Sequence, residues 1–228
     1  GKSTLMYLIA GIHRPSKGIV KVMGKEPYSL RGSERARLVG YVFQDPDQMI
    51  FSQTVKDELE FTLRLIGVKG KEAEVKVMEA ARELNIVDLL NRDPHKLSVG
   101  QRRLVTVASV LVARPRVLIL DEPTRGLDHG EGEVLMKYIK EVKAREGSTV
   151  IMVTHNMRQV GDYSDLVYVM NNGQLAYRGS PVDAFDESLR HPEWGIRPPQ
   201  VFEVTKMAGR PRANLRWLKH AALAHSTV

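Results

Sequence analysis

The feature that most constrains this chain is an apolar run that ends in two adjacent carboxylates. Val117–Leu120 is wholly apolar, and Asp121 and Glu122 follow it directly. A strand without polar positions is typical of the middle of a parallel sheet that helices cover on both faces. Ligands of such α/β proteins bind at the carboxyl ends of the strands. The pair is therefore a candidate metal–nucleotide site, in which Asp121 orients Mg²⁺ and its waters and Glu122 polarises an attacking water.

A short serine–glycine turn precedes this strand. Ser98-Val99-Gly100-Gln101 opens a helix predicted over Gln101–Ala113, and Pro115 ends that helix. Free backbone N–H groups at the start of a helix can bind a phosphate. In this order, with Gln101 and Asp121 twenty residues apart (121 minus 101), the two elements resemble the signature and Walker B motifs of ATP-binding cassette (ABC) ATPases.

The first four residues, Gly1-Lys2-Ser3-Thr4, resemble the end of a phosphate-binding P-loop of pattern G-x-x-x-x-G-K-[ST]. In such a loop the lysine contacts the β- and γ-phosphates and the following hydroxyl binds Mg²⁺. A helix is predicted over Lys2–Gly11, as expected after a P-loop. The first glycine of the pattern and the preceding strand are absent from the sequence. The chain therefore looks truncated within the loop, and as written we expect it to bind ATP poorly or not at all.

Two further polar residues follow predicted strands. Gln44 closes a strand predicted over Leu38–Gln44, and His155 follows a second buried strand predicted over Thr149–Thr154. Alone, each would be an ordinary loop residue. At the carboxyl ends of strands, they match the family's glutamine that touches Mg²⁺ and its histidine that contacts the γ-phosphate.

The resemblance implies a role for each candidate residue. The phosphates would be held by Gly1, Lys2, Ser3 and Thr4, and Mg²⁺ by Ser3, Gln44 and Asp121. Glu122 would activate the attacking water, and His155 would position the water and the γ-phosphate. In this family two cassettes pair head to tail, so Ser98, Gly100 and Gln101 would cover the ATP of a partner cassette, with Asp128 at the seam.

The family's signature usually has glycine where this chain has Val99. Glycine tolerates positive φ and a close backbone approach, whereas a β-branched residue does not. The substitution predicts a distorted phosphate site or slow hydrolysis at the partner site. We expect Val99→Gly in an intact protein to keep or raise ATPase activity.

Strands that alternate with helices indicate a parallel α/β sheet. The further predicted elements are a strand at Gly18–Gly24, a helical turn at Ser33–Arg37, helices at Val55–Ile66, Glu72–Leu84, Ile86–Asn91 and Glu131–Glu146, and a hairpin of Leu166–Met170 with Gln174–Tyr177. Gln53–Ser98 contains helices and no strand, so it resembles an inserted helical lobe. We therefore predict a P-loop NTPase fold of class α/β, with small antiparallel β elements. We expect the ABC ATPase domain to span 1–189, with its core at 1–52 and 99–180 and its lobe at 53–98. A basic extension is expected at 190–228.

Composition limits the class of protein. The 228 residues are 43% hydrophobic, which suffices for one large core or one core with a smaller lobe. No apolar run approaches the length of a membrane span, and the lack of cysteine excludes disulfides, cysteine zinc sites and thiol catalysis. With an ATP site, this points to the cytoplasm. Of the net charge of +7, residues 190–228 supply +5, from seven Lys/Arg and two Glu. Such a segment favours nucleic acid or an anionic membrane face, or is a solvated tail or linker.

Two shorter stretches are similar to the ATPase subunits of energy-coupling factor transporters, which include cobalt and nickel importers. The first is Asp45–Phe51, followed by Thr54-Val55 and the acidic pair Asp57-Glu58. The second is Trp194–Glu203. This resemblance implies a motor at the cytoplasmic face of the membrane that powers import of a vitamin or metal ion. Its partners would be a second ABC ATPase (identical or paralogous), an integral membrane coupling protein and a small substrate-binding membrane subunit, with no nucleic acid. A non-transport ABC ATPase that acts on ribosomes or nucleic acid remains the alternative.

Overall fold

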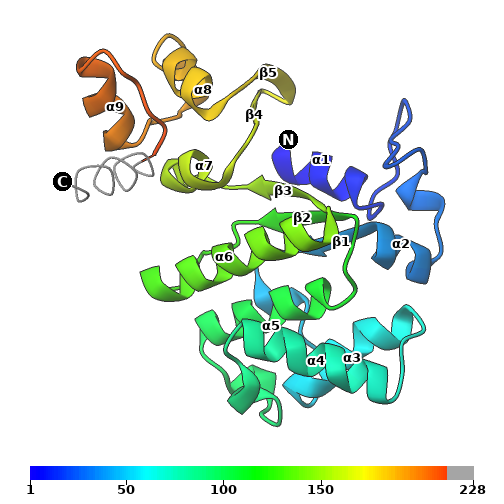
Figure 1. Cartoon of the computed structure of the whole chain (residues 1–228). Coiled ribbons are helices and arrows are strands. Elements are labelled where there is room, and N and C mark those ends of the chain that lie inside the picture. The colour runs from blue at the N-terminus through cyan, green and yellow to red at the C-terminus, as the bar shows by residue number, and fades with distance from the viewer. Residues whose placement is uncertain (215–228) are drawn as a thin grey trace. The chain divides into compact units, whose positions relative to one another are not determined.

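The computed structural model describes residues 1–214, which form two units (Figure 1). The larger unit, Ser3–Val153, is built on a three-stranded parallel sheet of order β1-β2-β3. Its strands are β1 (Val39–Val42), β2 (Val117–Asp121) and β3 (Thr149–Val153). All five residues of β2 are buried, as its apolar sequence predicts, because β2 is paired on both sides.

Helices surround this sheet, and most of them match the predicted ranges. They are α1 (Lys2–Ile9), α2 (Gly32–Leu38), α3 (Val55–Leu65), α4 (Lys71–Glu83), α5 (Val99–Leu111) and α6 (His129–Glu146). Residues 53–98, all of which the structure describes, contain α3, α4 and two 3₁₀ turns but no strand. Figure 1 shows α3, α4 and α5 together below the sheet.

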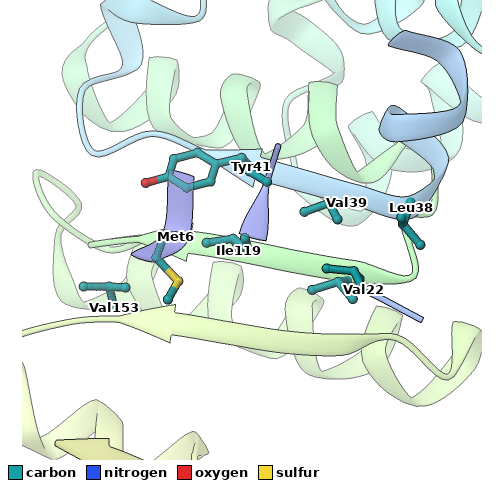
Figure 2. Packing of buried hydrophobic residues seen from close by; sticks show 9 residues of the cluster. Met6, Val22, Leu38, Val39, Tyr41, Ile119 and Val153 are labelled. Carbon is teal, nitrogen blue, oxygen red and sulfur yellow. The ribbon is translucent and has the colours of Figure 1, made fainter. Parts of the chain in front are cut away.

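The core beside the sheet lies between α1 and one face of the strands (Figure 2). Met6 of α1 packs against the same cluster as Ile119, which is fully buried, and Val153, the last residue of β3. Figure 2 shows Met6 near the end of β3 that carries Val153. The remaining buried members of this cluster are Ala10, Val22, Leu38, Val39, Tyr41 and Val117.

The direction of α1 follows from its two ends. Its carboxyl end leads to Gly11, whose carbonyl oxygen accepts a hydrogen bond from Arg35 Nη1 at 3.1 Å. Arg35 lies in α2, which runs directly into the amino end of β1. Gly11 has φ +69°, and a Cβ there would lie 2.5 Å from the carbonyl carbon of Pro27, so only glycine fits. The far end of α1, which starts with Lys2 and Ser3, therefore points Ser3 toward the carboxyl ends of the strands.

Among the described residues, the second unit comprises Gly1, Lys2 and residues 154–214. It contains α7 (Met157–Tyr163), β4 (Val167–Asn171), β5 (Gln174–Gly179), α8 (Pro181–Ser188) and α9 (Gln200–Met207). The hairpin of β4 and β5 closes through Asn172 and Gly173, both with positive φ (48° and 78°), as the Asn-Gly sequence predicts.

Part of the basic extension is folded in this unit. Phe202 of α9 is fully buried and its ring lies 5.6 Å from that of Phe185 in α8. Asp186 forms ion pairs with Arg190 and Lys206, which lower the pKa of its carboxyl group, chiefly through the Lys206 hydrogen bond. Phe202 and Ala213 of this extension are therefore packed in a hydrophobic cluster of the second unit. The two basic residues Arg216 and Lys219 lie outside the described residues.

Two predicted elements differ in the structure. Gly18–Gly24 is not a strand, since its only pairing is an isolated bridge between Val22 and Lys25. Ile19 and Val22 are three residues apart, so a strand would place them on opposite faces, and only Val22 is buried. The helix predicted over Ile86–Asn91 is a 3₁₀ turn at Val87–Leu89.

The strand β3 forms at the predicted place, but the prediction that it is buried was wrong. Thr149 is exposed, Val150, Ile151 and Met152 are half-buried, and only Val153 is buried. Among the described residues β3 pairs with β2 alone, so it is an edge of the sheet. No described helix is long and apolar enough to cross a membrane.

Candidate functional site

The candidate site lies where the strands of the larger unit end, which we call the carboxyl edge. The parallel register sets Val42 of β1 beside Leu120 of β2, so Gln44 and Asp121 leave neighbouring strands at this edge. Ser3 reaches the edge from α1. Tyr7, one helical turn after Ser3, places its ring 5.5 Å from that of Tyr41 in β1, which fixes this face of α1 against β1.

Asp121 is buried and held by a tyrosine. Its side chain is only 5% exposed, and its Oδ2 accepts a hydrogen bond from Tyr41 Oη at 3.1 Å. Burial, and then the charge of Asp121, raise the pKa of Tyr41 above its ordinary value. The hydroxyl therefore remains a donor over the physiological range and fixes one oxygen of the carboxylate. From the sequence, Tyr41 is only a residue of the strand predicted over Leu38–Gln44, and this role is not predicted.

Glu122 has an unusual backbone. Its φ is +48°, a left-handed conformation that is uncommon for residues other than glycine and that clusters at functional sites. Its N–H donates to the carbonyl oxygen of Val153 at 2.9 Å, so β3 holds this conformation in place. The side chain is half-buried. The second carboxylate thus leaves the strand with a different backbone direction from Asp121, although the two are adjacent in sequence.

Arg103 is the second residue that the sequence analysis missed. It lies in α5 and is only 1% exposed. Its guanidinium donates to the carbonyl oxygen of Phe43 at 2.6 Å and to that of Gln44. Burial lowers the pKa of Arg103, while the carboxylates of Asp45, Asp121 and Glu122 act in the opposite direction. Val107 and Leu111 follow Arg103 by four and eight residues in the predicted helix, so Arg103 lies on the apolar face of that helix. A charged residue on an apolar face was the sequence feature that could have indicated its role.

The serine–glycine turn forms as a helix start. The Ser98 hydroxyl accepts from the N–H of Gln101 at 3.1 Å, and Gln101 Oε1 accepts from the N–H of Ser98 at 3.1 Å. This capping box begins α5. Asp128 and Glu131 form the same arrangement at the start of α6, with donor–acceptor distances of 2.8 and 3.2 Å. Both segments expose their capping residues, Ser98 and Asp128.

These two helix starts are in contact. A Cβ added at Gly100 would lie 2.7 Å from Glu131 Oε2, so Gly100 allows the carboxylate of the second helix to approach. A Cβ added at Gly126 would lie 2.9 Å from Val99 Cγ1. The structure therefore brings Ser98–Gln101 and Gly126–Asp128 into one surface of the larger unit.

Val99 is the first residue of α5, and its φ is not positive. We expected a distorted turn because a positive φ would require glycine at this position. The structure has no positive φ at Val99, so this argument for a distorted turn does not apply. Its side chain is 51% exposed. The predicted effect of Val99→Gly on activity remains a prediction.

The remaining candidates lie at the start of the sequence and after β3. Gly1 precedes α1, Lys2 is the first residue of that helix, and Ser3 and Thr4 are exposed in its first turn. His155 is exposed in the segment between β3 and α7, two residues after the end of β3.

The residues at the carboxyl edge fit a magnesium–nucleotide complex better than a metal centre made of protein alone. In the described part of the chain, no group of three or more His, Cys, Asp or Glu could hold a metal ion. Mg²⁺ usually takes one or two carboxylates and completes its shell with water and substrate phosphates. Ser3, Gln44 and Asp121 offer a hydroxyl, an amide oxygen and a carboxylate at one edge. The exposed first turn of α1 offers N–H groups to phosphates.

Known proteins resemble this chain over most of its length. A family model described as "ABC transporter" matches residues 1–125. The chain is 38% identical over 210 residues to a putative ABC transporter ATP-binding protein of Caldanaerobacter subterraneus, covering 92% of this chain and 37% of that protein. It is 36% identical over 212 residues to the energy-coupling factor transporter ATP-binding protein EcfA of Methanocaldococcus jannaschii, covering 92% and 76%. The chain thus spans little more than a third of the first relative and about three quarters of the second.

Solved structures share the fold. The structure of cbiO1 from Clostridium perfringens, described as part of the ABC transporter complex cbiONQ, matches with a TM-score of 0.71 and 36% identity, over 86% of this chain and 81% of that one. A dimeric ATP-binding cassette, MJ0796, bound to ADP and Pi, matches with a TM-score of 0.72 and 25% identity, over 79% and 81%. The predicted P-loop NTPase fold of class α/β is thereby confirmed.

Proposed function

The chain belongs to the ABC transporter family of ATPases, and from this premise we propose that it powers the membrane import of a vitamin or metal ion. The observation that carries the proposal is the convergence of Ser3, Gln44, Asp121 and Glu122 at the carboxyl edge of a parallel sheet. The relatives named as energy-coupling factor ATP-binding proteins support the importer class.

At this edge, each side chain has one task in the proposed reaction. Ser3, Gln44 and Asp121 would hold Mg²⁺, which would offset the charge of the phosphates. Glu122 would accept a proton from the attacking water, whose oxygen forms a bond to the γ-phosphorus as the bond to the leaving ADP oxygen breaks. Tyr41 keeps the Asp121 carboxylate in one orientation, so less reorganisation is needed during the reaction.

The phosphates and the water have further ligands in the proposal. Gly1, Lys2 and Thr4 bind the phosphates together with the N–H groups of the first turn of α1. His155 positions the attacking water and the γ-phosphate.

A second cassette, identical or paralogous, completes the site in the proposal. Ser98, Gly100 and Gln101 cover the nucleotide of the partner, with Asp128 at the seam between the two. The exposure of Ser98 and Asp128 and the contact between their two segments support this arrangement. A relative described as a dimer bound to ADP and Pi supports it as well.

Membrane proteins complete the proposed machine. We infer that the chain lies at the cytoplasmic face and works with an integral membrane coupling protein and a substrate-binding membrane subunit. The description of cbiO1 as part of a transporter complex supports this inference. No partner of the nucleic-acid class is part of the proposal.

Replacement of Glu122 by Gln tests the catalytic proposal in a protein that carries the complete phosphate loop. We expect kcat for ATP hydrolysis to fall by about a hundredfold or more because the general base is lost. Binding of ATP, measured by equilibrium dialysis, should persist. Glu133→Gln is the matched control, since the side chain of Glu133 is 63% exposed and pairs with His129 at the surface of α6. Wild-type turnover in Glu122→Gln would overturn the assignment.

Purification from detergent-solubilised membranes of its own cells tests the transport proposal. We expect a polytopic membrane protein to accompany the tagged chain in a fixed ratio, with a second, small membrane subunit. Ribosomal proteins or RNA without any membrane protein would overturn the importer proposal in favour of a non-transport ATPase.

A further inference from the structure

Two successive arginines of α5 reach the loop that follows β1. Arg103 donates to the carbonyl oxygens of Phe43 and Gln44, at 2.6 Å for the former. Arg102 forms an ion pair with Asp47 at 3.0 Å between Nε and Oδ1. The loop from residue 43 to residue 47 is thus attached at both ends to the first turns of α5.

The same helix turn is attached to the segment before Ser98. Arg102 Nη1 donates to the carbonyl oxygen of Leu97 at 2.6 Å. Leu97 is buried and directly precedes the capping box of Ser98 and Gln101. The signature turn and the loop of Gln44 are therefore both fixed to one rigid element, over a few residues of α5.

Burial of the Arg103 guanidinium costs free energy, although it donates hydrogen bonds to two carbonyl groups. A guanidinium that is 1% exposed loses its hydration. Its Nε is buried without a hydrogen-bond partner in the described part of the chain. What the guanidinium adds is a fixed geometry between α5 and the main chain at Gln44.

We propose that Arg103 is a positioning residue that couples the signature turn to Gln44, with the Arg102–Asp47 ion pair as a second connection. The inference rests on the proposed roles of Ser98 and Gln44. When the nucleotide of a partner cassette binds at Ser98 and Gly100, any shift of α5 carries the main chain of Gln44 with it. Binding at one nucleotide site thereby changes the magnesium ligand of the other.

The test compares Arg103→Met and Arg103→Lys in a protein that carries the complete phosphate loop. Met leaves both carbonyls without the guanidinium, whereas Lys keeps the charge but not the two-pronged donor geometry. For Arg103→Met we expect kcat to fall about tenfold or more. We expect the Mg²⁺ concentration for half-maximal turnover to rise by about tenfold. The KM for ATP should stay within about twofold, and Arg103→Lys should restore part of both losses.

Leu111→Ala is the matched control for lost stability. Leu111 is 3% exposed at the other end of α5, so its truncation should destabilise the same helix. Turnover per folded molecule and its Mg²⁺ dependence should remain those of the wild type. Should Arg103→Met fail to fold, Asp47→Asn removes the surface connection alone, and we expect a rise of about threefold in the Mg²⁺ requirement.

A loss of kcat in Arg103→Met that only follows the folded fraction, with unchanged Mg²⁺ dependence, would overturn the coupling. So would a wild-type Mg²⁺ dependence in both Arg103→Lys and Asp47→Asn. Glu122→Gln separates this outcome from failure of the site itself. If Glu122→Gln abolishes turnover while the Arg103 variants behave as wild type, only the coupling fails; if Glu122→Gln retains turnover, the proposed site fails.

Discussion

Replacement of Tyr41 by Phe removes one hydroxyl and leaves the packing of the core unchanged. The Tyr41 ring lies 5.5 Å from the ring of Tyr7 and 4.6 Å from that of Phe43, and phenylalanine keeps both contacts. What is lost is the 3.1 Å hydrogen bond to Asp121 Oδ2. Asp121 is only 5% exposed, so water does not readily replace the donor.

The expected cost follows from the charge of the acceptor. A hydrogen bond to a charged group contributes about 1.5–3 kcal/mol, and a buried acceptor left without a donor loses most of that. For a protein of this size the loss corresponds to a fall of roughly 3–12 °C in Tm. Urea unfolding and calorimetry at pH 7 measure both quantities. Tyr28→Phe is the control, because Tyr28 is 50% exposed, and we expect it to change stability by less than about 0.5 kcal/mol.

The pH dependence gives a second, independent check on Tyr41→Phe. The pKa of Tyr41 is raised in the folded state, by burial first and by Asp121 second. Its contribution is therefore complete below the unfolded pKa of about 10 and is lost as the pH rises above it. Above this pH, Tyr41 ionises in the unfolded wild type, which stabilises the unfolded state. The free energy of unfolding of the wild type then falls by up to about 1.4 kcal/mol per pH unit, whereas that of Tyr41→Phe lacks this contribution. The stability gap between the two proteins should shrink above pH ~10. Equal stability at pH 7, or a constant gap through the alkaline range, would refute the reasoning.

Three further substitutions test other parts of the structure. Gly40→Ala should cost about 1–3 kcal/mol in urea unfolding, since its Cβ would lie 2.5 Å from Val110 Cγ1; unchanged stability would mean that α5 packs less closely on β1. Val99→Gly, in an intact protein, should keep or raise ATPase turnover, and a large loss in a steady-state assay would contradict our interpretation of the signature turn. Phe202→Ala should destabilise the second unit by about 3–5 kcal/mol, because the ring is fully buried. Hydrogen exchange in α8 should then accelerate, whereas the surface variant Arg190→Ala should leave it near wild type.

Features determined by neighbouring residues in the sequence were predictable. The capping box of Ser98 with Gln101 and the N-cap of Thr54 depend on residues three apart. The hairpin at Asn172-Gly173 depends on two residues that adopt positive φ. In each case the determining interaction is local, so the sequence contains all of it.

The errors concern elements whose environment is set by distant parts of the chain. β3 has a sequence as apolar as many central strands, but its burial depends on how many strands pair with it, and among the described residues only β2 does. Gly18–Gly24 needed a partner strand, and among the described residues its pairing is limited to the isolated bridge between Val22 and Lys25. A pattern along the chain specifies which face of an element is apolar, whereas pairing is a property of the whole sheet.

The two missed residues show what this difference means for a functional site. Tyr41 and Asp121 are eighty residues apart, and Arg103 and Gln44 fifty-nine. Their contacts exist only because β1 pairs in parallel with β2 at one register, and because α5 crosses the end of β1. A slip of one residue in that register would turn Tyr41 to the opposite face of the sheet and leave Asp121 without its donor. The chemical groups at the edge are therefore readable from sequence, but the residues that orient them are not, because orientation is fixed by the same register that builds the core.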